Sequence, residues 1–354
     1  MKTKLHLIIL CLLLFFAGGG SVIHAADSWS YPTSKPDGKF GGGSGSYYDP
    51  YLINNAQQLA DLAYMVNHGE YFKGKYFKLT TDITLNENVL KEDGTPNMSG
   101  TFKNWTPIGE HGIISDDDFM GRFDGCGHTI RGLYMREVER AYQGLFGSIK
   151  SAEIKNRNFE DCLLQADYNC WGDTNIGIVI GTSYESTCMN IHVSKAWVEK
   201  LHGKGGKVHL GGIIGRCYQT WEFRKGIDVA NSSFNGTIKA EIDRNTSFLG
   251  CGGIAGGSTS EGILTDCVSR GDIYVINTYD DVSLQVEVAG LTNCRHIGAV
   301  TNCVNYTNIH LRSTTYENNR NDQPKNYYYQ ICAFTLCSGS GEPFKNCVNF
   351  GLLL

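Results

Sequence analysis

A degenerate repeat constrains the fold of this chain more than any single motif does. Its first anchor is a Gly-apolar-x-Gly motif, which is clearest at residues 144–147, 212–215 and 253–256. Weaker copies begin at 178, 290 and 333, so successive copies lie 34 to 43 residues apart. A period of this length is typical of stacked units, none of which can bury its apolar face alone. We therefore expect a solenoid whose repeat units start at about residue 144.

A second anchor follows each first one and has the form apolar-x-Asn, with Asp in one copy. Between the anchors, apolar and polar residues alternate as in β-strands. Gly, which tight turns favour, makes up 43 of 354 residues. Units that each advance by one strand spacing, about 4.8 Å, form a parallel β-solenoid. Asn tolerates the left-handed backbone of a turn, and its amide can bond the next unit. We predict a structural ladder with no ligand role at Asn156, Asn190, Asn231, Asp266, Asn302 and Asn346.

The N-terminus has the pattern of a secretory signal peptide. Lys2 and Lys4 precede an apolar run over residues 7–17, and small residues then lead to Ala25 and Ala26. The run holds 11 residues, whereas a transmembrane helix needs about 20, and no later segment is long and apolar enough. We expect residues 1–26 to be a signal peptide cleaved near Ala25 or Ala26, so that the mature chain is secreted or lies at the cell surface.

The next segments differ in character. Residues 27–48 are polar and contain a run of Gly and Ser, which predicts a flexible leader. Asn55 begins a capping-box-like pattern, and Leu59 to Val66 follow at helical spacing before Gly69. We expect one short helix over about 56–68, which covers the open strand edge of the first coil. The solenoid itself is expected over residues 49–354.

Residues 47–160 resemble the N-terminal module of bacterial surface proteins that carry the GLUG motif, and the rest of the chain resembles them more loosely. The matching stretches, in order, are residues 49–53, 59–63, 74–79, 104–109, 123–130 and 144–147. The resemblance implies an all-β, right-handed parallel β-helix in a secreted or surface-exposed bacterial protein. Some members carry this repeat ahead of a metalloprotease. This chain has no H-E-x-x-H sequence, so that activity is not carried over.

The net charge of the mature chain limits the classes of partner that it can bind. Without residues 1–26, the chain has 29 Lys and Arg against 36 Asp and Glu. This balance argues against nucleic acid or an anionic membrane as the main partner.

Twelve of the 13 cysteines remain in the mature chain, and three of them, Cys267, Cys303 and Cys347, occupy one repeat position. We favour buried small side chains over disulfide bridges, although an even count in a secreted chain also fits bridges. No C-x-x-C pair is present, and we expect neither a zinc site nor a cofactor.

Two polar clusters are candidates for a calcium site and for an acid/base pair. Asp116, Asp117 and Asp118 could offer hard oxygen ligands to calcium, but runs of Asp in loops are usually only solvated and the spacing of an EF-hand is absent. Asp124 and His128 resemble an acid/base pair, but Gly residues between them indicate a tight turn in which Asp124 binds turn amides. We favour the structural interpretation of both clusters.

Aromatic residues in polar loops are the best functional signal. Tyr and Trp on loops over a rigid scaffold can stack on sugar rings or contact a protein partner, although they can equally close the ends of coils. The candidate ligand-binding residues are Trp171, Trp221, Tyr218, Tyr316 and Tyr327.

These observations favour a non-catalytic β-helix module for adhesion or for binding an extracellular glycan or a host or cell-surface protein. The sequence contains no G-x-S-x-G motif and no Walker loop. The alternative is a polysaccharide lyase or glycoside hydrolase, because parallel β-helices also host such enzymes. Those enzymes need clustered carboxylates, or Arg and Lys, along one groove, and no such cluster stands at repeat spacing.

The last residues suggest an uncovered final coil. The chain stops just after a second anchor with Leu352, Leu353 and Leu354. We expect an open rung edge there, because solenoids normally need a capping unit at each end. The alternative is that the three Leu fold back over the last coil as a small plug.

Overall fold

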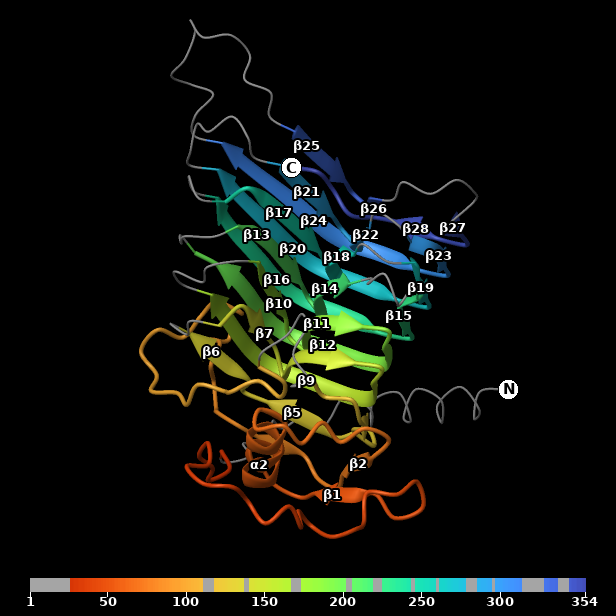
Figure 1. The fold of residues 1–354 in the computed structure, drawn as a ribbon. Helices are drawn as coiled ribbons and strands as arrows, with labels where there is room; N and C mark the ends of the chain where they lie inside the picture. Colours follow the sequence, from red (N-terminus) through yellow and green to blue (C-terminus); the bar gives the residue numbers. More distant parts are fainter. Residues whose placement is uncertain are drawn as a thin grey trace, which may run out of the picture.

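The computed structural model describes residues 26–110, 118–136, 140–166, 173–201, 206–218, 225–242, 246–258, 261–277, 285–294, 297–313, 328–336 and 344–354. Strands account for 54% of the structure and helix for 4%. The strands stack as the coils of a parallel β-helix (Figure 1), which confirms the predicted fold. In these ranges no helix is long and apolar enough to cross a membrane.

One 16-stranded sheet, here called the large sheet, forms one side of the β-helix. Its first coils contain β1 (Tyr51–Ile53), β2 (Tyr76–Leu79), β3 (Ile83–Thr84), β4 (Arg122–Asp124), β5 (Thr129–Arg131) and β6 (Tyr134–Arg136). Its long strands are β9 (Glu153–Ala166), β12 (Thr187–Lys200), β16 (Ser233–Ile242), β20 (Val268–Asn277) and β24 (Val304–Ser313). Its short strands are β15 (Lys225–Ala230), β19 (Glu261–Thr265), β23 (Ile297–Thr301), β27 (Phe344–Lys345) and β28 (Val348–Asn349).

Two six-stranded sheets complete each coil. The second sheet contains β7 (Tyr142–Gln143), β10 (Thr174–Gly177), β13 (Lys207–Gly211), β17 (Phe248–Gly252), β21 (Gln285–Ala289) and β25 (Tyr328–Cys332). The third sheet contains β8 (Phe146–Lys150), β11 (Ile180–Tyr184), β14 (Ile214–Tyr218), β18 (Ala255–Ser258), β22 (Thr292–Cys294) and β26 (Thr335–Leu336). A coil therefore runs along a long strand, then the second sheet, the third sheet and a short strand, and turns a corner into the next long strand.

Registered strands stack equivalent apolar residues in columns inside the coils. One such column begins at Phe77 and passes through Phe123, Ile154 and Cys188 to Val229. All five side chains are at most 1% exposed. Because each coil contributes one residue to each column, the alternating pattern of the sequence becomes a continuous core along the axis.

The Gly-apolar-x-Gly motif forms the turn between the second and third sheets. A Cβ atom on Gly215 would lie 2.5 Å from the backbone N of Ile176, and one on Gly256 would lie 2.4 Å from the carbonyl carbon of Leu210. The last Gly of the motif is therefore needed because the two sheets approach too closely for a side chain. Asn293 replaces this Gly in a weaker copy. Its side chain fits because the neighbouring residue Gly250 has no Cβ, which would lie 2.7 Å from the Asn293 amide nitrogen.

The predicted ladder is present at the corner between the short and long strands. All six residues have φ between 45° and 55°. The amide nitrogen of each Asn donates to the side chain one coil earlier, for example Asn190 to Asn156 at 2.7 Å and Asn346 to Asn302 at 3.2 Å. Two runs result, each headed by a carboxylate that can only accept. The first is Asp124, Asn156, Asn190 and Asn231, and the second is Asp266, Asn302 and Asn346.

The single helix of the described residues, α2 (Ala56–Val66), covers the first coil as predicted, at the end of the molecule that is orange in Figure 1. Asn55 caps it by accepting from the backbone N–H of Gln58 at 3.0 Å, and the Gln58 side chain accepts from the N–H of Asn54 at 2.7 Å. Leu59 and Leu62 on its inner face are fully buried in the main core.

The prediction of a flexible leader over residues 27–48 is wrong. Trp29 is 5% exposed, and its indole N–H donates to the carbonyl of Leu85 at 3.0 Å. Phe40 packs edge-on against Phe77, with ring centroids 5.5 Å apart. Two aromatic anchors therefore hold this Gly-rich segment on the first coil, because burial of apolar surface offsets the entropy that the backbone loses when it is ordered. Residues 1–25, which include most of the expected signal peptide, lie outside the described residues.

The described cysteines pack as small apolar residues. Cys162, Cys188, Cys217, Cys251, Cys267 and Cys303 are buried free thiols, and Cys126, Cys332 and Cys347 are more exposed free thiols. The backbone N–H of Cys267 points at the sulfur of Cys303 one coil later, at 3.4 Å. Burial raises the pKa of the Cys188 thiol to about 12, so this side chain stays a neutral core residue.

The three final Leu extend the large sheet. The backbone N–H of Ile309 donates to the carbonyl of Leu352, and that of Leu354 donates to the carbonyl of Ile309, both at 2.8 Å. The three side chains are 54–59% exposed. They therefore continue beside β24 and do not fold over the coil as a plug.

Candidate binding face on the long strands

Two columns of side chains on the outer face of the long strands form the best candidate site, here called the strip. Registered pairs align one residue per coil in each column. The first column contains Arg136, Gln165, Glu199, Lys239, Tyr274 and His310, and the second contains Tyr134, Leu163, Trp197, Thr237, Asp272 and Asn308. The columns lie side by side because their residues are two apart on each strand and so point to the same face.

Glu199 is the centre of the polar part of the strip. Its Oε2 accepts from the Gln165 amide at 2.8 Å and from the Trp197 indole N–H at 2.9 Å. Its Oε1 lies 2.8 Å from the ammonium of Lys239. The residue is only 3% exposed. A buried carboxylate with three partners is held rigidly, and it fixes the indole ring of Trp197, which is half-buried at the surface.

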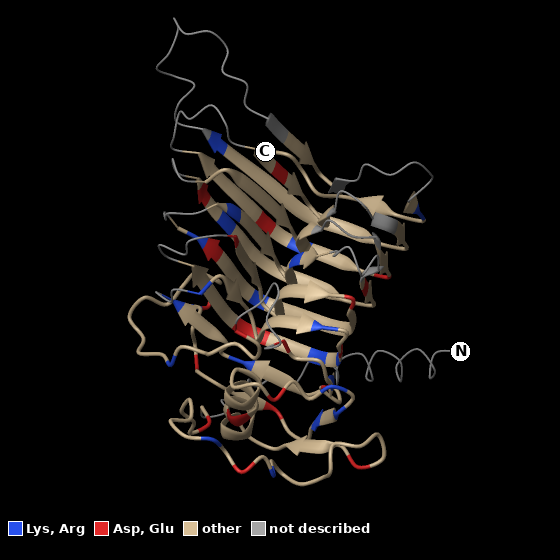
Figure 2. Ribbon diagram, viewed as in Figure 1, with Lys and Arg blue, Asp and Glu red and all other residues tan. Residues whose placement is uncertain are grey.

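Lys239 is shared between two carboxylates. Its ammonium lies 2.8 Å from both Glu199 and Glu241. Burial alone would lower the pKa of Lys239, but its bonds to Glu199 and Glu241 outweigh burial and raise the pKa. Positive and negative residues are interspersed along the long strands and do not gather by sign (Figure 2). The strip therefore presents fixed polar groups without a strong field of one sign.

The C-terminal part of the strip, on β20 and β24, is aromatic. Tyr274 and His310 stack across neighbouring coils, with ring centroids 4.4 Å apart and planes inclined by 13°. Asp272 holds the His310 ring through Nε2 at 2.8 Å. All three residues are half-buried, so their rings and polar atoms remain partly accessible to a ligand.

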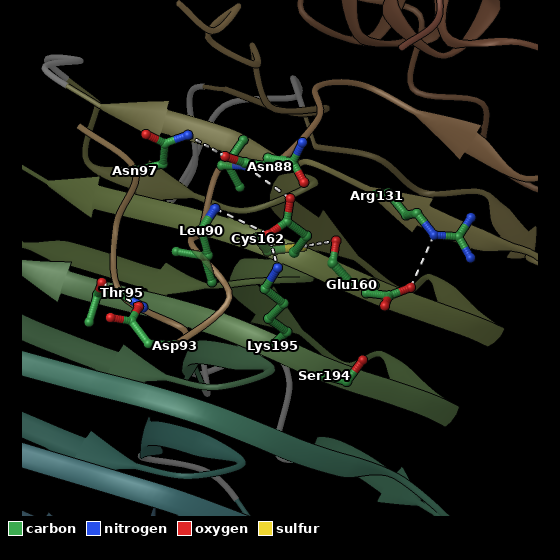
Figure 3. Close-up of polar contacts among 12 residues, drawn as sticks. Asn88, Leu90, Asp93, Thr95, Asn97, Arg131, Glu160, Cys162, Ser194 and Lys195 are labelled. Atoms are coloured by element: carbon green, nitrogen blue, oxygen red, sulfur yellow. Dashed lines mark hydrogen bonds and ion pairs between the residues drawn. The ribbon is translucent and has the colours of Figure 1, made fainter. Parts of the chain in front are cut away.

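A long connection between β3 and β4, here called the wall, lies at the N-terminal end of the strip. Figure 3 shows Asn88, Leu90 and Asn97 of this connection beside the strands that carry Glu160 and Lys195. The carboxylate of Asp161 accepts from the backbone N–H groups of Val89 and Leu90 at 2.9 and 3.1 Å.

Apolar contacts complete this attachment. Val89, Leu90 and Leu163 form a small buried cluster, and Trp197 packs at its edge. The strip is therefore bounded at one end, as a binding surface for an extended ligand would be.

Of the predicted aromatic residues, the structure describes only Tyr218. It lies at the end of β14, where its ring stacks on Tyr184 with centroids 5.4 Å apart and under the guanidinium of Arg216 at 3.9 Å. Asp173 accepts from Tyr218 at 3.1 Å and from Arg216 at 2.6 Å. Burial, together with Asp173, raises the pKa of Tyr218 to about 12 despite Arg216. Tyr218 is thus a neutral phenol held in a rigid stack and does not project from a loop.

The remaining predicted aromatic residues, Trp171, Trp221, Tyr316 and Tyr327, lie outside the described residues. Trp171 is nevertheless two residues before Asp173 in the sequence, and Trp221 is three residues after Tyr218. In the sequence, Asp173 and Tyr218 therefore flank the segments that carry the two Trp residues.

Asp124 and His128 do not form an acid/base pair. Asp124 accepts from the N–H of Cys126 at 2.8 Å and from the amide of Asn156 at 3.0 Å. His128 instead lies 3.3 Å from Asp82. The structural interpretation of Asp124 as a turn residue is confirmed.

The calcium hypothesis gains no support from the part that is described. Asp116 and Asp117 lie outside the described residues, and Asp118 is 4% exposed. Within the described ranges, no three His, Cys, Asp or Glu side chains are placed to hold a metal ion.

Sequence reasoning missed the strip, although a signal for it exists. The first-column residue follows the second anchor by nine positions at Asn156 and Asn190, but by eight positions at Asn231, Asp266 and Asn302. The extra residue is a bulge in β9 and β12, where Asp161 and Lys195 have φ of 55° and 48°. An alignment that allowed for the bulge would have placed Glu199, Lys239 and Tyr274 in one column.

Comparisons with known proteins agree with a β-helix but show no family. No protein-family model matches the chain. Over 182 residues, 50% of the chain, it is 29% identical to halomucin of Haloquadratum walsbyi, and it matches 2% of that protein. Over 110 residues, 31% of the chain, it is 31% identical to a "Putative Gly-rich membrane protein" of Evansella cellulosilytica, and it matches 11% of that protein. The chain thus spans only a small part of either relative.

Among solved structures, the chain is similar to one described as a "putative immunoglobulin A1 protease" from Bacteroides ovatus. The TM-score is 0.57 and the identity is 19%, and the match covers 91% of this chain and 81% of that one. At this identity the similarity shows the fold alone.

Proposed function

We propose that the mature chain is an extracellular, non-catalytic binding module, and that the strip is its ligand-binding face. The observation that carries the proposal is the rigid group of Trp197, Glu199 and Lys239, in which a half-buried indole ring is fixed beside a shared carboxylate. Fixed aromatic and polar groups on a scaffold that cannot deform are typical of recognition surfaces, because little entropy is lost on binding.

The ligand we propose is an extended, largely neutral glycan. Half-buried rings such as Trp197 and Tyr274 present apolar faces against which a sugar ring can pack. Their half-buried neighbours Asp272 and Asn308 offer hydroxyl groups carboxylate and amide acceptors and an amide donor. The interspersed charges of this face favour a neutral ligand over a strongly charged polymer. A protein ligand is the competing outcome of the test.

The segments around Trp171 and Trp221 form a second part of the proposal. In the sequence they are flanked by Asp173 and Tyr218, which hydrogen-bond to each other. We propose that these two Trp residues, with Tyr316 and Tyr327 in later coils, supplement the strip. We also propose that the chain is exported by the N-terminal signal sequence and is related to the GLUG-motif surface proteins.

A glycan array tests the binding face. We expect the mature protein to bind a subset of glycans, and Trp197→Ala to lose most of that binding while the protein remains folded. Tyr48→Ala is the matched control, because Tyr48 is 92% exposed and lies outside the strip. Retention of full binding by Trp197→Ala, or binding only to proteins in a parallel screen, would argue against a glycan on the strip. Trp171→Ala and Trp221→Ala test the second part separately.

Digestion assays on the same glycans test the enzymatic alternative. Depolymerisation of any polysaccharide by the wild-type protein, abolished by Glu199→Gln or by Asp124→Asn, would replace the binding module with a carbohydrate-active enzyme. We expect no cleavage.

A further inference from the structure

Arg157 is the most anomalous side chain in the described part of the molecule. It is 1% exposed, and none of its three guanidinium nitrogens has a hydrogen-bond partner. Its guanidinium carbon lies 4.2 Å from the ring centroid of Phe123 and 5.8 Å from that of Phe159. Aromatic faces attract a cation, but they do not satisfy the five N–H donors of a guanidinium.

The repeat shows that this position does not require an arginine. Arg157 follows the ladder residue Asn156, and the register aligns it with Ile191 one coil later. Ile191 is fully buried, and the small residues Ser232, Cys267 and Cys303 hold the corresponding position in later coils. Packing alone would therefore favour an uncharged side chain, so the charge needs another explanation.

A depression lies at the same corner. Its volume is about 410 Å³, and it is lined by Asp124, Cys126, Gly127, Asn156, Arg157, Asn158, Asn190, His192 and Asn231. The amide nitrogen of Asn158 donates to the carbonyl of Gly127 at 2.9 Å, and that of Asn190 donates to Asn156 at 2.7 Å. Each of these amides has a second N–H. The corner therefore combines additional donors with an unsatisfied cation whose guanidinium is enclosed, so the Arg157 side chain has to turn away from the Phe123 ring to meet a ligand in the depression.

We propose that this corner depression is an oxyanion-binding site and that Arg157 is the residue that anchors the ligand. A guanidinium binds a carboxylate, sulfate or phosphate group through two parallel hydrogen bonds. The ligand is either the carboxylate of an acidic sugar or a free inorganic oxyanion. The site is separate from the strip, and the proposal does not depend on the strip binding a glycan. It also assigns a ligand role to the ladder residue Asn190, for which the sequence pattern predicted none.

Asp124 is the competing partner for Arg157. It is the only carboxylate among the lining residues, and its charge favours the protonated form of Arg157, whose pKa burial nevertheless lowers to about 9. The Asp124 carboxylate accepts from Cys126 and Asn156, as described above, and no ion pair joins it to Arg157. The test must therefore separate an external oxyanion from a rearranged Asp124.

Thermal unfolding of the mature full-length chain provides the test. Melting temperatures are measured with sodium glucuronate, sodium sulfate or glucose, and sodium chloride keeps the ionic strength constant. For the wild type, an oxyanion at about ten times its dissociation constant should raise the melting temperature by roughly 2–4 °C. Arg157→Ile should abolish this shift, and it should fold at least as stably as the wild type without the anion, because it restores the residue type of the next coil.

Arg122→Ile is the matched control, because Arg122 is a partly exposed arginine near Glu153, at 3.9 Å, and should retain the shift. A shift with glucuronate alone assigns an acidic sugar, and a shift with sulfate as well assigns a free oxyanion. Equal shifts in the wild type and Arg157→Ile would overturn the proposal. So would a destabilising effect of Asp124→Asn that disappears in the Arg157→Ile background, since Asp124 would then be the counter-charge.

Discussion

Asn302 shows what a single ladder residue contributes. It has φ of 54° and joins Asp266 to Asn346 through side-chain bonds of 2.9 and 3.2 Å. The sequence predicted its left-handed turn and its bonds, because Asn recurs at this position. The residue is exposed, so each of its bonds competes with water and is worth less than a buried one.

We expect Asn302→Ala to destabilise the protein by about 1–2 kcal/mol, chiefly because Ala resists the left-handed backbone. Asn302→Gly removes the same side-chain bonds without that strain, so it should cost only about 0.5–1 kcal/mol. Urea unfolding of the three proteins measures both quantities. If both variants unfold at the wild-type urea concentration, the ladder contributes nothing to stability.

His209 should make the stability depend on pH. Its side chain is buried, and its Nδ1 lies 3.0 Å from the carbonyl oxygen of the Asn175 side chain, so Nδ1 carries the proton of a neutral ring. Burial, together with the positive charges of Arg216 and Lys207, lowers the pKa of His209 well below 6.5. Below pH 6.5 the unfolded chain therefore binds a proton that the folded chain does not.

The free energy of unfolding should consequently be constant above pH 6.5 and fall by roughly 1 kcal/mol between pH 6.5 and 5.5. His209→Asn introduces the residue of the preceding coil and should remove most of this decrease. His68→Asn, at an exposed position, should not. Urea titrations across this pH range provide the measurement, and an unchanged slope in His209→Asn would contradict the assignment.

At the scale of single elements, the connection between β3 and β4 depends on Asp161. This carboxylate accepts from the N–H groups of Val89 and Leu90 and lies 3.2 Å from the ammonium of Lys195. In Asp161→Asn the left-handed backbone is tolerated, but one of the two acceptor oxygens becomes a donor.

We expect Asp161→Asn to loosen this connection while the coils remain folded. Limited proteolysis within residues 87–103 should become faster, and the amides of Val89 and Leu90 should exchange hydrogen faster. Glu160→Gln is the control, because the Glu160 side chain is 46% exposed and pairs with Arg131. Equal protection in both variants would mean that apolar contacts alone hold the wall.

The same elements show where sequence reasoning ends. The anchors predicted the repeat and the corner ladder, because each rests on a local backbone demand that only Gly or Asn meets readily. The strip depends instead on register, and the bulges at Asp161 and Lys195 shift that register by one residue in two coils. A side chain's face in a strand reverses with each such shift, so Glu199 and Lys239 could not be aligned from spacing alone.

On the scale of the whole molecule, a β-helix is a row of coils in which each coil contacts only its neighbours. The overall fold was predictable because the same pattern recurs along the chain and its errors average out. The N-terminal segment was not, because its Gly-Ser run suggested flexibility, whereas Trp29 and Phe40 hold it on the first coil.

We expect Leu62→Asp to detach the cap, because Leu62 is fully buried on the inner face of α2. The later coils should remain folded, and the uncovered first coil should associate with other molecules through its strand edge. Light scattering should then report oligomers, while circular dichroism retains its strand signal. Lys73→Gln changes the net charge by the same amount at an exposed site and should stay at the mass of the wild type. A monomeric Leu62→Asp protein would show that the cap has no protective role.

The two runs of the ladder also have an electrostatic direction. In each run every Asn donates toward the N-terminal coil, so the side-chain amide dipoles align head to tail along the axis of the β-helix. Asp124 and Asp266 stand at the positive end of each row, as an acidic residue does at the start of an α-helix. The corner of this β-structure therefore carries polarised rows that end in carboxylates. Insertion of a further unit with Asn at this position would lengthen a row, whereas a unit with Asp would start a new one.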